Sequence, residues 1–168
     1  AGVDRLLVAM ADEHYALRLH ALRHADSHFD SEPALFERAL EMVRAEADPN
    51  VLLQLAMSLG ESSDPRAVAG LAEIAARHGG MRWMDSAVLS SLASKAGDFL
   101  ALALAKHPTI SASILERAAV TAARGGDLSP LAAAVEHPDE SLRLRLLELI
   151  AKHGSGARDD LREAVDRA

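Results

Sequence analysis

The sequence predicts an all-α protein, an α-solenoid (an α-α superhelix) with four to five irregular helix pairs. Hydrophobic residues make up 49% of the chain but aromatic residues only 3%, so the core must consist mainly of Ala, Leu, Val, Ile and Met. These residues suit helices, whereas a β-sandwich would need more β-branched and aromatic side chains. The acidic turn residues Asp12, Asp48 and Asp85 lie 36 and 37 positions apart, a period typical of stacked helical pairs.

Punctuating residues divide the first half of the chain into three pairs. Pro33 suits the first turn of a helix, and Asp48 is expected to cap the helix that follows it. Gly60 is expected to end that helix as a C-cap glycine, and Gly79 and Gly80 to end the next one. The expected helices cover residues 3–10, 15–25, 34–45, 51–59, 66–78 and 85–93.

The second half continues the pattern at closer spacing. Pro108, Gly125 and Pro130 mark breaks, and the turn residues Ser111 and Asp139 lie only 28 positions apart. The later repeats are therefore expected to be irregular. The expected helices cover residues 98–106, 113–124, 130–136 and 141–153, followed by residues 157–168 as a cap or the first helix of a further repeat.

These helices are short, and isolated helices of this length are marginal in water. Each pair has apolar residues on more than one face, which only neighbouring pairs can cover. A solenoid over residues 1–168 is therefore expected, as one domain of a longer protein. The rival fold, an ordinary helical bundle, predicts longer helices and no recurrent turn.

Composition argues against several function classes. The net charge of −7 opposes nucleic-acid binding, which needs a basic surface. The absence of cysteine excludes disulfides, thiolate catalysis, Cys-ligated zinc and a covalent c-type haem within these residues. No apolar run approaches the ~20 residues that span a bilayer, so no membrane insertion is expected.

Three stretches carry a family resemblance: Arg-Leu-His-Ala-Leu at 18–22, Asp-Pro-Asn-Val-Leu-Leu-Gln-Leu-Ala-Met-Ser-Leu-Gly at 48–60, and Ala-Val-Leu-Ser-Ser-Leu at 87–92. Together with Gly-x-x-x-Asp-Pro-Arg-Ala at 60–67 they resemble HEAT repeats. More narrowly, they are similar to the HEAT segment of planctomycete-type multidomain membrane-bound dehydrogenase and c-type haem-binding proteins. The resemblance covers roughly residues 3–135.

In that group the segment lies between a sugar-dehydrogenase-like β-propeller and a c-type cytochrome domain. The resemblance implies a spacer or docking module outside the cytoplasm, in the periplasm or secreted. Neither the propeller nor a Cys-x-x-Cys-His motif is present in these residues, so no redox activity carries over.

In arrays of the HEAT type, the second helices of the pairs line the concave surface. This places a mixed polar strip there, which we take as the candidate protein-binding face; a solvated face without a partner is the alternative. The strip consists of Arg18, His20, Arg23, Gln54, Ser58, Ser86, Ser90, Glu116, Arg143 and Arg145.

Two other features suggest possible sites. His20 and His24 are spaced to share one helix face, as two ligands of a divalent metal would be, but tetrahedral zinc needs three or four ligands. Solvated surface histidines are therefore the expectation, with no metal. Trp83, the only tryptophan, is expected to fold back over the helices, the alternative being an exposed anchor for a partner.

No catalytic constellation is recognised. The acidic pairs at 12–13, 139–140 and 159–160 fall at predicted turns or helix starts, where carboxylates favour the helix N-terminus. The sequence thus predicts a non-catalytic interaction or spacer module without a cofactor, whose partner is a protein or a neighbouring domain of the same chain. The alternatives are a HEAT-like ligand- or metal-binding module and a pigment-lyase-like enzyme with a chromophore pocket.

Overall fold

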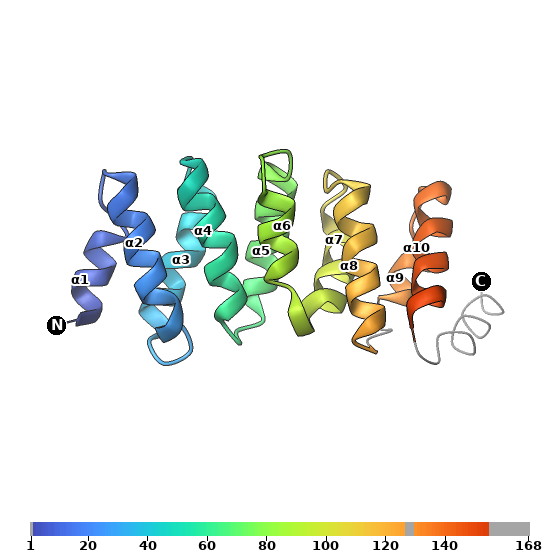
Figure 1. Ribbon diagram of the computed structural model, residues 1–168, viewed down its shortest axis with the longest axis horizontal. Helices are drawn as coiled ribbons and strands as arrows, with labels where there is room; N and C mark the ends of the chain where they lie inside the picture. The colour runs from blue at the N-terminus through green and yellow to red at the C-terminus, as the bar shows by residue number, and fades with distance from the viewer. Residues whose placement is uncertain (1, 127–129, 155–168) are drawn as a thin grey trace. The chain divides into compact units, whose positions relative to one another are not determined.

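The computed structural model describes residues 2–126 and 130–154, and over these residues the chain is helical without any strand (Figure 1). The predicted all-α helical-repeat fold is confirmed. The chain divides into two compact units, the first ending at Ser91 and the second beginning at Leu92. The predicted final helix at 157–168, with its acidic pair at 159–160, lies outside the described residues.

The first unit consists of three helix pairs in two layers. Helices α1, α3 and α5 pack side by side in one layer, and α2, α4 and α6 in the other (Figure 1). Each helix also packs against its partner in the pair. The elements are α1 (Gly2–Ala9), α2 (Tyr15–Ala25), the 3-10 turn η1 (Asp26–His28), α3 (Pro33–Ala45), α4 (Pro49–Glu61), α5 (Arg66–His78) and α6 (Met84–Ser90).

The second unit repeats this arrangement with two pairs. Helix α7 pairs with α8 and α9 with α10, while α7 contacts α9 and α8 contacts α10. Phe99, Ile114, Leu146 and Ile150 are buried between these helices. The elements are η2 (Ala93–Lys95), α7 (Ala96–Lys106), α8 (Ala112–Arg124), α9 (Leu131–Val135) and α10 (Glu140–His153).

The N-cap residues of the second helices give the repeat length directly. His14, Asp48 and Trp83 are 34 and 35 positions apart, whereas Trp83, Ser111 and Asp139 are each 28 apart. The expected tightening of the later repeats is confirmed. The predicted spacing of 36 and 37 was slightly too long, because Asp12 precedes the N-cap of α2 and Asp85 lies inside α6.

The predicted helix end at Gly60 was wrong, because α4 continues to Glu61. The glycine serves close packing instead. A Cβ atom at Gly60 would lie 2.7 Å from Cβ and 2.9 Å from Cα of Ser91, the residue that follows α6. Helix α4 therefore needs a residue without a side chain where α6 ends against it.

Among the described residues, no single helix is long and apolar enough to cross a membrane. Over the same described residues, Met84–Ser90 and Ala93–Lys106 have the length and composition of a span when they are taken together across the break between them.

Candidate interaction surface

Most loops between the two helices of a pair are closed by their own side chains. The residue two positions before the N-cap accepts a hydrogen bond from the N-cap N–H in three pairs: Asp12 Oδ1 at 2.8 Å, Glu46 Oε1 at 2.8 Å and His137 Nδ1 at 3.2 Å. Such local bonds satisfy backbone donors that the helix leaves free. These loops are therefore held independently of any partner.

In two of these loops, the arginine four residues after the N-cap donates further hydrogen bonds to the loop backbone. Arg18 donates to the carbonyl oxygens of Asp12 and Glu13, both at 2.9 Å, and Arg143 donates to the carbonyl of His137 at 3.1 Å. Arg18 also binds the carboxylate of Glu46. Both arginines belong to the predicted polar strip, and in the structure their side chains hydrogen-bond to the backbone of these loops.

The loop between α5 and α6 departs from this pattern. Met81 occupies the position of the accepting side chain, and the N-cap Trp83 makes no side-chain capping bond. The backbone of Trp83 is left-handed, with φ of 69°, and 61% of the residue is exposed. A bulky residue in this conformation costs roughly 1–3 kcal/mol. The expectation that Trp83 folds back over the helices was wrong.

The indole ring of Trp83 is not bare, because the guanidinium carbon of Arg82 lies 5.0 Å from its ring centroid. A guanidinium over an indole face is attracted by the ring quadrupole and keeps its N–H edge free for other partners. In Figure 1 this loop lies at the upper edge of the first unit, alongside the loops that precede α2 and α4. The first unit therefore presents an exposed Arg–Trp pair at this edge.

Further cations lie at the C-terminal ends of α3 and α5. Arg77 donates to the carbonyl oxygens of Val43 and Arg44 at 3.3 Å each, which caps the last turn of α3. Glu73 is 3.6 Å from both Arg44 and Arg77. Burial, and secondarily the charge of Arg77, lowers the pKa of His78, so this ring adds no charge near neutral pH.

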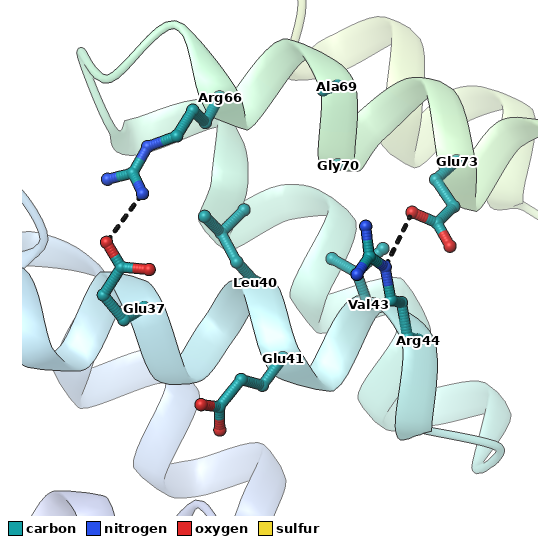
Figure 2. Close-up of a pocket in the computed structure, with 9 residues that line it drawn as sticks. All are labelled: Glu37, Leu40, Glu41, Val43, Arg44, Arg66, Ala69, Gly70 and Glu73. Carbon is teal, nitrogen blue, oxygen red and sulfur yellow. Dashed lines mark hydrogen bonds and ion pairs between the residues drawn. The ribbon is translucent and has the colours of Figure 1, made fainter.

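A groove of about 560 Å³ runs between α3 and α5 (Figure 2). Two ion pairs join these helices across it, Glu37 to Arg66 at 2.6 Å and Arg44 to Glu73 at 3.6 Å. Glu37, Glu41 and Glu73 offset Arg44 and Arg66 along the groove, so the groove itself has no excess of positive charge. Leu40, Val43, Ala69 and Gly70 also line it, with Glu41 beside them.

Gly70 explains how α3 and α5 approach each other at this groove. A Cβ atom there would lie 3.0 Å from Cδ1 of Leu59 and 3.4 Å from Cγ2 of Val43. Two further contacts fix the side chain of Arg66 at the groove. Its guanidinium carbon lies 5.3 Å from the ring centroid of Phe36, and its N–H groups donate to the carboxylate of Asp64. The groove therefore follows from the packing of the two helices.

The structure places the predicted strip residues in different environments. Gln54 and Ser58 are buried, with 8% and 0% of their surface exposed, so they do not belong to an exposed face. Gln54 Nε2 donates to Ser58 Oγ, which donates to Asp26 Oδ2, both at 3.0 Å. These polar residues join α4 to η1. The exposed members of the strip are His20, Arg23, Ser86, Ser90 and Arg145, the last bound to Glu116 at 2.9 Å.

The histidine pair on α2 gathers no further ligand in the described part of the chain. His20 and His24 are both exposed. Over residues 2–126 and 130–154, no group of three or more His, Asp or Glu side chains is arranged to hold a metal ion. The two histidines alone do not make a tetrahedral site.

No protein-family model, curated protein or solved structure matches the chain. The HEAT-type resemblance and its functional implications therefore remain predictions from the sequence.

Proposed function

We propose that this chain is a non-catalytic helical-repeat module that binds a protein partner, and that the corner around Trp83 takes part in the binding. The observation that carries the proposal is the combination of exposure and left-handed backbone at Trp83. A fold gains little from an exposed tryptophan in a strained conformation, whereas Trp and Arg dominate the energetics of protein interfaces. A pure spacer has no use for such a loop.

The wider setting follows from the resemblance. The partner is either a neighbouring domain of the same polypeptide or a separate protein, and in a HEAT-type dehydrogenase the flanking domains are the propeller and the cytochrome, outside the cytoplasm. The two layers of paired helices support a HEAT-like assignment. The cap-to-cap spacings of 34, 35 and 28 are shorter than the ~40–47 residues of standard HEAT repeats, so the repeats are a short, irregular form.

Photo-crosslinking tests this function. A benzoylphenylalanine at Ser86, an exposed residue in the first turn of α6, is compared with one at Ser113, an exposed residue in the first turn of α8. In an extract of the source organism, we expect a discrete crosslinked product from position 86 only. Excess unlabelled wild type should suppress it, and the Trp83→Gly variant should not.

The proposal fails if position 113 gives the same product, or if Trp83→Gly competes as well as the wild type. In either case the corner around Trp83 is not the binding surface.

A further inference from the structure

We propose that the partner segment bound at the Trp83 corner is an acidic peptide that also presents an apolar side chain. The inference rests on the proposed function and specifies its partner by charge. We define the corner as Arg44, Arg77, Arg82 and Trp83. Its members come from the ends of α3 and α5 and from the loop that joins α5 to α6.

The corner carries a local positive charge. Arg77 reaches the backbone carbonyl of Arg44, and both side chains lie 3.6 Å from the same carboxylate, that of Glu73. The side chain of Arg44 is 81% exposed. Arg44 and Arg77 thus share one carboxylate, and Arg82, in the loop that follows α5, adds a third guanidinium group to the corner. The corner therefore has cationic N–H groups left for an incoming anion.

Arg82 and Trp83 form the part of the corner best suited to a peptide. The guanidinium stacks over the indole ring, which limits its motion before any partner arrives. Its edge remains open to a carboxylate, and guanidinium groups bind carboxylates with paired hydrogen bonds. An apolar side chain of the peptide can pack against the exposed surface of the indole.

The rest of the unit makes this corner distinctive. The loop before α2 carries Asp12 and Glu13, the loop before α4 ends in Asp48, and the whole chain has a net charge of −7. The α5–α6 loop itself, residues 79–83, carries Arg82 and no carboxylate, and Asp85, which follows in the first turn of α6, accepts the N–H of Ser86 at 2.7 Å. An acidic segment therefore meets less repulsion at this loop than along the rest of the edge. Charge complementarity of this kind selects partners and fixes their position.

The fluorescence of Trp83 offers a direct test, because it is the only tryptophan in the chain. The wild-type chain is titrated with short synthetic peptides built from repeats of Glu-Glu-Phe, Gln-Gln-Phe or Lys-Lys-Phe. We expect the Glu-Glu-Phe peptide alone to shift the Trp83 emission to the blue, as the indole becomes covered. Binding should weaken as salt screens the charges.

Arginine variants locate the site. Arg82→Ala and Arg44→Ala should each weaken binding by about tenfold, the effect of losing one charge-assisted hydrogen bond. Arg124→Ala is the matched control, because Arg124 is an exposed arginine in the last turn of α8. Circular dichroism checks that each variant is folded.

Four results would overturn the acidic partner: no binding of the Glu-Glu-Phe peptide, equal binding of Gln-Gln-Phe or Lys-Lys-Phe, an equal loss from Arg124→Ala, or equal binding of an oligonucleotide. The last would assign the corner to nucleic acid. If the peptide fails while the crosslink at position 86 is still competed by the wild type, the interaction role stands and only the acidic partner is wrong.

Discussion

Arg18 on α2 holds the carboxylate of Glu46 with two hydrogen bonds of 2.7 and 2.8 Å. The side chain of Glu46 is only 5% exposed, and its Oε1 atom also accepts the N–H groups of Ala47 and Asp48 at 2.9 and 2.8 Å. One carboxylate thus fastens the first helix pair to the loop of the second. Within the first unit, this bond joins neighbouring repeats through charge as well as apolar packing.

Removing the arginine should leave this carboxylate buried without its cation. We expect Arg18→Ala to lower the free energy of unfolding by about 2–3 kcal/mol, because hydrogen bonds to a charged group are lost at a site shielded from water. Arg23→Ala, an exposed arginine on the same helix, should change it by less than about 0.5 kcal/mol. Urea unfolding followed by circular dichroism measures both, and similar losses would contradict the assignment.

The same pair predicts a dependence on pH. Burial alone would raise the pKa of Glu46, but the hydrogen bonds from Arg18, Asp48 and Ala47 outweigh it, so the pKa lies below its usual value. The stabilisation is therefore complete above the unfolded-state pKa of about 4.3 and is lost as the pH falls through the lower native value.

The variant Glu46→Gln removes this titration. Wild type should be more stable than the variant near neutral pH, and the difference should shrink as the pH falls below about 4.3. Unfolding curves at a series of pH values give this difference. A difference that stays constant or grows on acidification would show that Glu46 is not the group responsible.

Gly60 and Gly80 provide a test of whether a glycine is required by close packing. Gly60→Ala would place a methyl group within 2.9 Å of the Ser91 backbone, whereas a Cβ atom at Gly80 meets nothing within 4 Å. We expect Gly60→Ala to destabilise the chain by about 1–3 kcal/mol, the usual cost of overpacking. Gly80→Ala should be close to neutral. Thermal unfolding of both variants decides, and equal melting temperatures would refute the close contact.

Replacement of Trp83 should reveal whether the fold needs it. In Trp83→Gly, the relief of backbone strain offsets the loss of the part of the ring that is buried, so we expect a change within about 1 kcal/mol. Phe36→Ala, which removes a ring that is fully buried, should cost about 3–5 kcal/mol. A loss of that size for Trp83→Gly would mean that the tryptophan serves the fold.

The local signals that the sequence carries were sufficient to predict most of the fold. Asp48 followed by Pro49 predicts a capped helix start, and Asp48 Oδ1 does accept the N–H groups of Asn50 and Val51. Capping residues and prolines act on the backbone within a few residues, so the helix ends they set can be predicted from the sequence without knowledge of tertiary contacts. The prediction that Gly60 ends its helix was wrong because this glycine is required by close packing against Ser91, which lies 31 positions away in the sequence.

The candidate surface was less predictable for the same reason. Gln54 and Ser58 are polar and therefore look exposed, but a partner in η1, Asp26, satisfies them in the interior. Large aromatic residues are usually buried, which favoured a covered Trp83. One signal was present in the sequence: the position of the loop acceptor, occupied by Asp12 and Glu46, holds Met81 in this pair.

The constant cap spacing from Trp83 to Ser111 to Asp139 has a genetic consequence. A duplication or loss of 28 codons between two of these caps keeps every later cap in register, whereas the first unit requires steps of 34 or 35. A change of 28 codons between two of the later caps would therefore add or remove one whole helix pair. We expect length differences between this chain and its relatives to fall after residue 83 and to come in multiples of 28.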